Sequence, residues 1–460
     1  MGSKKNAWLK FDDTKKEEIF SFCEGYKKYI SDCKTERESI KEAISLAESK
    51  GYRDLKNVIS AGKSLKAGDK VYYNNMDKSL ALFLIGSESI ESGMRIIGSH
   101  VDSPRLDLKP NPLYEDSELS LMETHYYGGV KKYQWVTIPL ALHGVVVKKD
   151  GTKIDVVVGE EETDPVVMVS DLLVHLASEQ QQKKATEVIA GEDLNILVGS
   201  MPLEGEEKEA VKANILKLLK EKYDFEEEDF MSAEIEIVPA GKARDLGLDR
   251  SMVAGYGHDD RICAYTSLLA LLETENTKKT SVVLLVDKEE VGSIGATGMQ
   301  SRFFENAVAE LMDRVGEYSE LKLRRALANS KMLSSDVTAA FDPNYAGAYE
   351  KKNSAFFGKG LAFAKYTGAR GKSGCNDANA EFVAWLRNVM DENDVAYQMA
   401  ELGKVDQGGG GTIAYILAEY GMEVIDCGVA LQNMHAPWEV ASKVDIFETM
   451  RGYKAFLMAE

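Results

Sequence analysis

Several features that mark common classes of protein are scarce or absent in this sequence. Its 460 residues include five cysteines, which are scattered and form no Cys-x-x-Cys pair. Separated cysteines in odd number argue against a disulfide framework and fit a reducing compartment. No uninterrupted apolar stretch approaches the ~20 residues that span a bilayer. Residues 1–13 lack the apolar core of a signal peptide, and Asn6 stands where myristoylation requires Ser or Thr. We therefore expect a cytoplasmic protein.

Positive charge is also in short supply. The chain has 56 Lys and Arg residues against 75 Asp and Glu residues, which gives a formal net charge of −19. Nucleic acids and anionic membranes are bound by basic surfaces, so we expect neither as a partner.

Nucleotide-binding and serine or cysteine nucleophile motifs are missing as well. Gly292–Gly298 is spaced GxxGxxG rather than GxGxxG, and Gly408–Gly411 is not followed by the Lys-Ser/Thr of a phosphate loop. We interpret both as turns where the backbone approaches a site closely. No serine or cysteine occupies a recognisable nucleophile elbow.

The residues that are present indicate a soluble protein with more than one domain. Hydrophobic residues make up 44% and charged residues 28% of a chain that is too long for one ordinary core. Strand and helix patterns alternate before residue 110 and again from about residue 243. Between them, residues 133–158 alternate with β period and turn at Asp150-Gly151. We predict one α/β domain, residues 1–110 and 243–460, interrupted by a β-rich insert, residues 111–242.

Hydrophobic periodicity predicts the main elements. Helices are expected at 14–50 (a surface pair), 206–223, 261–273, 303–314 and 381–390. Strands are expected at 70–73, 80–85, 94–98, 233–238, 282–286 and 422–426, with a hairpin over 133–158.

One strand end stands out as a candidate for chemistry. The apolar, β-branched run Val282–Val286 suits a strand that is buried on both faces, and it stops abruptly at Asp287-Lys288-Glu289-Glu290. Ligand sites of parallel sheets lie beyond the carboxyl ends of the strands. Glu289 and Glu290 can provide one metal ligand and one general base. The alternative is a solvated acidic turn after a core strand.

Histidine is rare enough for each context to be informative. The six are His100, His125, His143, His175, His258 and His435. His100 lies in GSHVDSP just past a strand, and Asp102, two residues on, can orient its ring as carboxylates do for metal-bound imidazole. The alternative is a solvated histidine in a turn. His435 by itself is no stronger a candidate than His143, which suits an ordinary sheet residue.

Two aspartates have a structural and a functional interpretation. Asp259 opens a helix, where an aspartate is first of all an N-cap or a partner of the helix dipole. It can also be a carboxylate that bridges two metal ions. Asp336, in SSDVTAAFDPNY, has the same two interpretations.

Five ordered segments resemble the aspartyl aminopeptidase and vacuolar aminopeptidase I family of dinuclear metallopeptidases. They are GSHVDSPRLDLKP (98–110), ARDLGLDRSMVAGYGHDDRICAY (243–265), DKEEVGSIGATG (287–298), SSDVTAAFDPNY (334–345) and MHAPWE (434–439). The resemblance implies an α/β fold, namely a mixed-sheet α/β/α metallopeptidase domain with a β-rich inserted dimerisation domain. It also implies an aminopeptidase that removes the N-terminal residue of peptides with a free amino terminus.

The resemblance also assigns roles in the site. His100 and Asp336 would bind one metal, Glu290 and His435 the other, and Asp259 would bridge both. Asp102 would orient His100, and Glu289 would be the general base that acts on a metal-bridged water. The oxygen and imidazole donors suit two zinc ions, with cobalt or manganese as alternatives.

Assembly follows from the resemblance too. Members of the family form dimers that build a closed dodecamer, and their inserted domain contributes a histidine to the neighbouring subunit's site. His175, in SDLLVHLASE, matches that position.

The sequence departs from the family's pattern at one place. Where the aspartyl branch carries an Arg-Asn-Asp-Ser type segment, this chain has Gly403–Gln407, followed by glycines and Thr412. It is therefore closer to the aminopeptidase I branch, and the preferred N-terminal residue stays open. Lys404 can meet an acidic side chain or remain solvated. Two other functions stay open: a dinuclear carboxypeptidase or deacylase with a similar ligand set, and a non-catalytic scaffold that inherited the fold.

Overall fold

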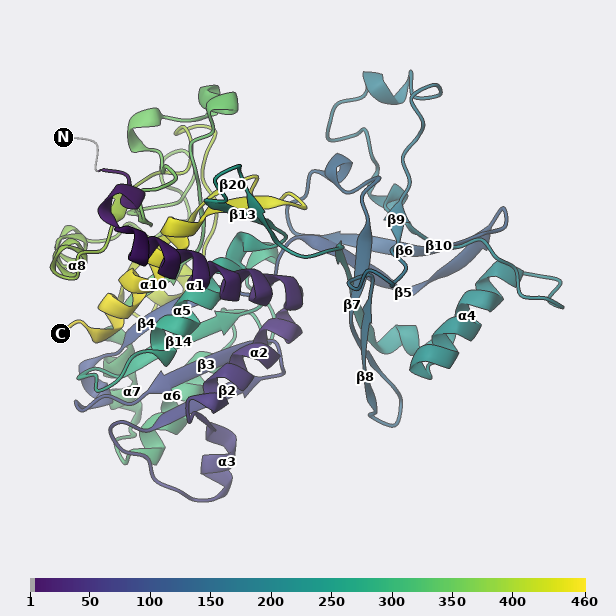
Figure 1. Cartoon of the computed structure of the whole chain (residues 1–460). Helices are drawn as coiled ribbons and strands as arrows, with labels where there is room; N and C mark the ends of the chain where they lie inside the picture. Colours follow the sequence, from purple (N-terminus) through teal and green to yellow (C-terminus); the bar gives the residue numbers. More distant parts are fainter. Residues whose placement is uncertain (1–4) are drawn as a thin grey trace. The chain divides into compact units, whose positions relative to one another are not determined.

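The chain divides into two compact units, each described here by itself (Figure 1). The computed structural model describes residues 5–460. Residues 1–4, which belong to the segment considered for a signal peptide and for myristoylation, lie outside the described residues. The first unit extends to Asp102, resumes over Ala243–Met434 and ends with Glu439–Glu460. The second comprises Ser103–Lys242 and His435–Trp438. The expected boundary at residues 110 and 111 falls inside a strand, Arg105–Asp116.

A mixed nine-stranded sheet forms the centre of the first unit. In spatial order its strands are β1 (Arg53–Asp54), β2 (Lys70–Asn75), β3 (Ser79–Leu84), β14 (Ser281–Val286), β4 (Arg95–His100), β15 (Lys331–Ser335), β19 (Glu423–Gly428), β17 (Leu361–Ala364) and β18 (Tyr397–Met399). The four neighbours β14, β4, β15 and β19 are parallel. Their carboxyl ends therefore meet at one edge, which is where His100, Glu289, Glu290 and Asp336 are found.

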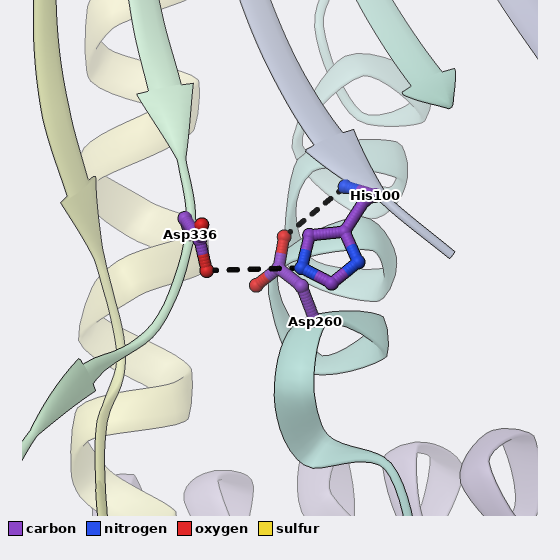
Figure 2. Close-up of side chains that lie close together, drawn as sticks. All are labelled: His100, Asp260 and Asp336. Carbon is purple, nitrogen blue, oxygen red and sulfur yellow. Dashed lines mark hydrogen bonds and ion pairs between the residues drawn. The ribbon is translucent and has the colours of Figure 1, made fainter. Parts of the chain in front are cut away.

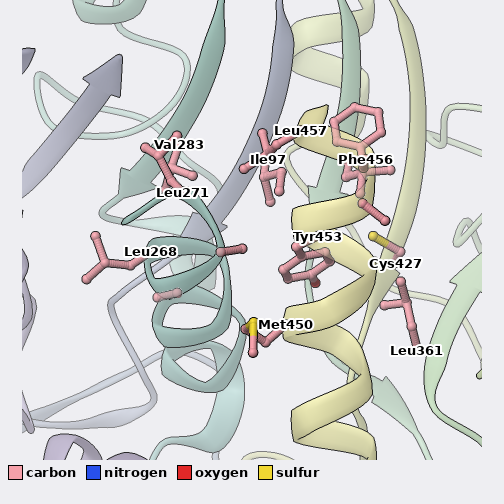
Figure 3. Packing of buried hydrophobic residues seen from close by; sticks show 14 of the residues in the cluster. Ile97, Leu268, Leu271, Val283, Leu361, Cys427, Met450, Tyr453, Phe456 and Leu457 are labelled. Carbon is pink, nitrogen blue, oxygen red and sulfur yellow. The ribbon is translucent and has the colours of Figure 1, made fainter. Parts of the chain in front are cut away.

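Alternate residues of each strand point to opposite sides of this sheet. Both sides carry apolar residues, and helices cover both faces. The helices of the first unit are α1 (Asp13–Asp32), α2 (Glu36–Ser49), α3 (Leu55–Ser60), α5 (His258–Leu272), α6 (Phe303–Arg314), α7 (Glu320–Ala328), α8 (Ala380–Glu392), α9 (Ala414–Ala418) and α10 (Lys443–Met458). One core joins Val283 and Ile97 to α1, α2, α5, α8 and α10. The other joins Val282 and Leu284 to α3, α6, α7 and α9. Figure 3 shows Leu268 and Leu271 of α5 and Tyr453 of α10 in the first of these cores.

A second, five-stranded sheet lies in the same unit and leads the chain into α5. Its order is β12 (Arg244–Leu246), β13 (Met252–Gly255), β21 (Glu439–Ser442), β20 (Ala430–Gln432) and β16 (Thr338–Ala339). The chain leaves β13 at Gly255 and enters α5 at His258. This short connection ties the first turn of α5 to the end of β13.

The second unit is built on an antiparallel seven-stranded sheet with one helix, α4 (Ala210–Tyr223). The strand order is β8 (Lys153–Val158), β7 (Leu140–Val147), β11 (Ala233–Pro239), β5 (Arg105–Asp116), β6 (Leu119–Tyr127), β10 (Ile196–Gly199) and β9 (Met168–Val169). His143 lies in β7 as an ordinary sheet residue, and its Nε2 is 2.9 Å from Oε1 of Glu160.

The predicted elements are present, with four corrections. The helix expected at 206–223 begins only at Ala210. Residues 133–139 are not part of the hairpin, because β7 begins only after Pro139, which has no N–H for a ladder bond. The predicted surface helices exist, but α1 buries a full face that includes Ile19 and Tyr26. The long β5–β6 hairpin was not predicted. Pro110 and Pro112 conceal it, and its register shifts between Leu108 and Leu113.

Two further expectations concern the environment of the chain. All five cysteines are free, and four of them are buried. Among residues 5–460, no helix combines the length and the apolar character needed to cross a membrane.

Candidate metal centre

The candidate site begins with His100, the last residue of β4 and only 2% exposed. Its Nδ1 lies 2.9 Å from the carbonyl oxygen of Asp102 and 3.3 Å from the Asp102 carboxylate. A carbonyl oxygen can only accept a hydrogen bond, so Nδ1 carries a proton. His100 Nε2 is therefore the nitrogen that is available to a metal ion.

Three carboxylates surround that nitrogen. Nε2 of His100 lies 3.2 Å from Oδ1 of Asp259, 3.8 Å from Oε2 of Glu289 and 3.8 Å from Oδ1 of Asp336. Figure 2 shows His100 and Asp336 approaching from two strands, with Asp260 between them at the start of α5. Residues from three distant parts of the sequence thus converge on the imidazole of His100.

Two sets of side chains have the donor spacing of a metal site. One is His100, Asp259 and Glu290, and the other is His100, Asp260 and Asp336, with the ligand atoms of each set within 4.8 Å of one another. Both sets share His100, so the two potential ion positions are adjacent. Asp260 was not singled out by its sequence context. Its only signal was its place beside Asp259 in His258-Asp259-Asp260.

The start of α5 explains why both aspartates face the site. The N-cap residue is Gly257 and makes no side-chain capping bond, so Asp259 is not an N-cap. Asp259 and Asp260 have non-helical backbone angles inside the first turn. Oδ2 of Asp260 accepts the backbone N–H of His100 at 3.3 Å. The first turn of α5 is therefore shaped by its contacts in the site rather than by helix capping.

Asp102 also has a second role that its sequence position did not reveal. Its Oδ1 accepts the backbone N–H of Glu289, and its Oδ2 accepts that of Glu290, each at 3.2 Å. The acidic segment after β14 is consequently a tight turn, with a short 3₁₀ helix over Glu289–Val291. The side chain of Glu289 is 14% exposed. The interpretation as a freely solvated acidic turn is wrong.

The electrostatics of the site favour cations. Burial and the neighbouring carboxylates raise the pKa of Asp260 and of Asp336 well above the usual range. Burial by itself would lower the pKa of His100, but Asp102 and Asp259 outweigh it and raise that pKa. Among the described residues, Oδ1 of Asp260 is buried with no hydrogen-bond partner. Imidazole and carboxylate donors without thiolate fit zinc, which would relieve this buried repulsion.

Two candidate histidines, His435 and His175, belong to the second unit. Nδ1 of His435 lies 2.9 Å from the carbonyl oxygen of Gly129, which leaves Nε2 as its lone-pair nitrogen. His175 is exposed and lies among exposed apolar residues, namely Leu172, Leu173, Val174 and Leu176.

Comparison with known proteins identifies the family to which the donor set belongs. Residues 29–457 match the family described as Aminopeptidase I zinc metalloprotease (M18). The chain is 67% identical over 454 residues to a probable M18 family aminopeptidase 1 of Clostridium acetobutylicum, a match that covers 98% of each chain. A probable M18 family aminopeptidase 1 of Thermotoga maritima is 47% identical, over 99% of this chain and 98% of the relative.

Solved structures agree with this match. The M18 aminopeptidase of Thermotoga maritima superposes with a TM-score of 0.95 at 46% identity, and aminopeptidase I of Clostridium acetobutylicum with 0.93 at 64%. Both matches cover 99% of each chain. A dodecamer of yeast aminopeptidase 1 shares the fold, with a TM-score of 0.77, 20% identity and coverage of 95% of this chain and 96% of that one. The predicted mixed α/β fold and the predicted family are confirmed, and the chain belongs to the M18 family of aminopeptidase I zinc metalloproteases.

Proposed function

We propose that this M18 aminopeptidase hydrolyses the N-terminal peptide bond of peptides at a centre of two divalent metal ions. The observation that carries the proposal is the pair of donor sets that share His100, one with Asp259 and Glu290 and the other with Asp260 and Asp336. A dinuclear site requires two adjacent ion positions joined by a shared ligand, and Asp259, rather than the imidazole, is the proposed shared ligand.

The ligand assignment is the one that the family resemblance implies. His100 and Asp336 would hold one ion, Glu290 and His435 the other, and Asp259 would bridge them. The 3.2 Å separation of His100 Nε2 and Asp259 Oδ1 supports a shared position for these two donors. Asp260 is engaged with the backbone N–H of His100, so we assign it to orienting that residue rather than to the bridge.

Zinc fits the donor set and the family, with cobalt and manganese as alternatives. Two zinc ions would lower the pKa of a shared water molecule and polarise the scissile carbonyl. The carboxylates of Asp259, Glu290 and Asp336 would offset most of the four positive charges, which makes burial of the ions feasible.

Glu289 is the proposed general base. Its Oε2 lies 3.8 Å from Nε2 of His100, so it is next to the proposed ions, and Glu289 belongs to neither donor set. From there it can take a proton from the attacking water and deliver it to the leaving amine. The backbone bond from Glu289 to Asp102 holds it at that place.

We assign catalysis to residues 1–110 and 243–460, which include His435, and dimerisation to residues 111–242. Four exposed apolar residues flank His175, namely Leu172, Leu173, Val174 and Leu176, which is the composition of a surface that is covered by another chain. In the proposed assembly His175 completes the site of the neighbouring subunit, and dimers build a dodecamer like that of the yeast enzyme. The free cysteines fit the expected cytoplasmic location.

Replacement of Glu289 by Gln tests the mechanism. The variant should keep the zinc content of the wild type and lose at least about a hundredfold in kcat, because Gln cannot accept the proton. Glu310→Gln, an exposed position on α6, is the control and should match the wild type. Full activity of E289Q would overturn the role of Glu289.

A panel of aminoacyl chromogenic substrates, each supplied with zinc, cobalt or manganese, tests the activity and its specificity. The matching N-acetylated substrates should resist cleavage, because one ion would bind the free amino group. Efficient cleavage of the acetylated substrates would instead support a deacylase or endopeptidase. A purified protein that stays inactive with all three metals would support the scaffold hypothesis.

A further inference from the structure

We propose that Glu439 is a positioning residue for the bridging carboxylate of Asp259, an inference that rests on the proposed function. Oε2 of Glu439 accepts the backbone N–H of Asp259 at 3.0 Å. Glu439 is 1% exposed, so this bond is shielded from water. Glu439 does not belong to either donor set. Its role is to fix the backbone of Asp259, from which the bridging carboxylate extends.

The five-stranded sheet holds Glu439 in place. It is the first residue of β21 and lies opposite Gly255, the last residue of β13. β21 is paired on both sides, with β13 and with β20. Directly after β21 the chain enters α10. A carboxylate on a strand with two paired neighbours is held more rigidly than one on a loop.

The backbone of Asp259 needs such an acceptor. Its angles, φ −80° and ψ 107°, are extended rather than helical, so the first turn of α5 does not fix its orientation. The hydrogen bond to Glu439 supplies the missing constraint on the peptide plane, and hence on the direction of the Asp259 side chain. A charged acceptor forms a stronger bond with an N–H than a neutral one does.

Three carboxylates around the site accept hydrogen bonds from backbone N–H groups of site residues. Asp102 accepts the backbone N–H groups of the two glutamates, Asp260 accepts that of His100, and Glu439 accepts that of Asp259. Each buried carboxylate therefore holds the backbone of a proposed site residue. When ionised, these carboxylates place negative charge behind the ligands, which favours a divalent cation in front of them.

The test replaces Glu439 by Gln in the full-length protein and measures zinc affinity by competition with a chromogenic chelator. Gln keeps the shape and one acceptor oxygen but removes the charge. Zinc affinity should fall 10- to 100-fold, the usual effect of removing a partner of a metal ligand. With saturating zinc, kcat should fall while KM changes less than twofold, because Glu439 lies behind the ligands.

Glu448→Gln is the matched control. Glu448 is also a fully buried carboxylate that accepts a backbone N–H, that of Ala396, but it lies on α10 outside the site. E448Q should lower the melting temperature without changing zinc affinity. Equal zinc affinity in E439Q, E448Q and the wild type would overturn the role of Glu439.

A second variant covers a failure of E439Q to fold. Glu439→Asp keeps the charge but shortens the side chain by one methylene, so it should fold and bind zinc several-fold more weakly than the wild type. Wild-type affinity in E439D would then overturn the proposal. A wild-type protein that binds no zinc would overturn the proposed function instead, so the two failures are distinguishable.

Discussion

Nδ1 of His100 lies closer to the backbone carbonyl of Asp102, at 2.9 Å, than to the Asp102 carboxylate, at 3.3 Å. The imidazole is therefore oriented mainly by the main chain. This relationship leaves the carboxylate of Asp102 with its two oxygens on the backbone N–H groups of Glu289 and Glu290. A residue expected to orient a histidine thus also holds the turn that carries the proposed general base.

Replacement of Asp102 by Asn should therefore damage catalysis more than its small change in size suggests. The Asn amide has one acceptor oxygen, so its NH₂ group would face one of the two backbone N–H groups. We expect kcat to fall 10- to 100-fold. Steady-state kinetics measure this effect, and Asp313→Asn, exposed on α6, is the control. A normal kcat in D102N would show that the turn needs no support from Asp102.

Removal of metal should destabilise the protein, and more so as the pH rises. Without ions, the raised pKa values of Asp260 and Asp336 mean that the folded state binds protons that the unfolded state has released. Stability is then present at low pH and is lost as the pH rises through the folded pKa values. The rise in melting temperature on adding zinc should be larger at pH 8 than at pH 5.5. Calorimetry of chelator-treated protein measures it, and an equal or smaller rise at pH 8 would contradict this account.

A second pH effect is expected outside the proposed ligand set, at Asp445 in α10. Burial, with Glu448 nearby, raises the pKa of Asp445 to about 7, although its oxygens accept the N–H groups of Gly358 and Gly360. The folded state therefore binds one proton more than the unfolded state between about pH 4 and pH 7. The corresponding stability is lost as the pH rises through this window, by about 4 kcal/mol at most.

Asp445→Asn isolates that effect, because Asn cannot ionise. The variant loses one acceptor, but its melting temperature relative to the wild type should be higher at pH 8 than at pH 5. Thermal unfolding of both proteins across this range measures the difference. A constant difference would mean that Asp445 does not titrate in this window.

Local sequence patterns were sufficient to predict most helices and strands of the first unit. Val282–Val286 reads as a buried strand because apolar, β-branched residues without interruption suit a strand that is covered on both faces. The helix over Phe303–Arg314 was predicted at its observed ends, because its apolar residues recur with helical spacing. Where local signals conflict, prediction failed: the prolines in β5 argue against a strand, and only the bulged pairing with β6 accommodates them.

The sequence by itself named the residues that are proposed to carry the chemistry, because side-chain type decides what can bind zinc or move a proton. His100, Asp259, Glu289, Glu290 and Asp336 were all named from their motifs, and the fold brings them together. Only the tertiary structure decided how they are held. The bonds from Asp259 to Glu439 and from Glu289 to Asp102 join residues 180 and 187 positions apart. No periodicity or spacing encodes such pairs, because they exist only once the sheets have brought distant strand ends to one edge.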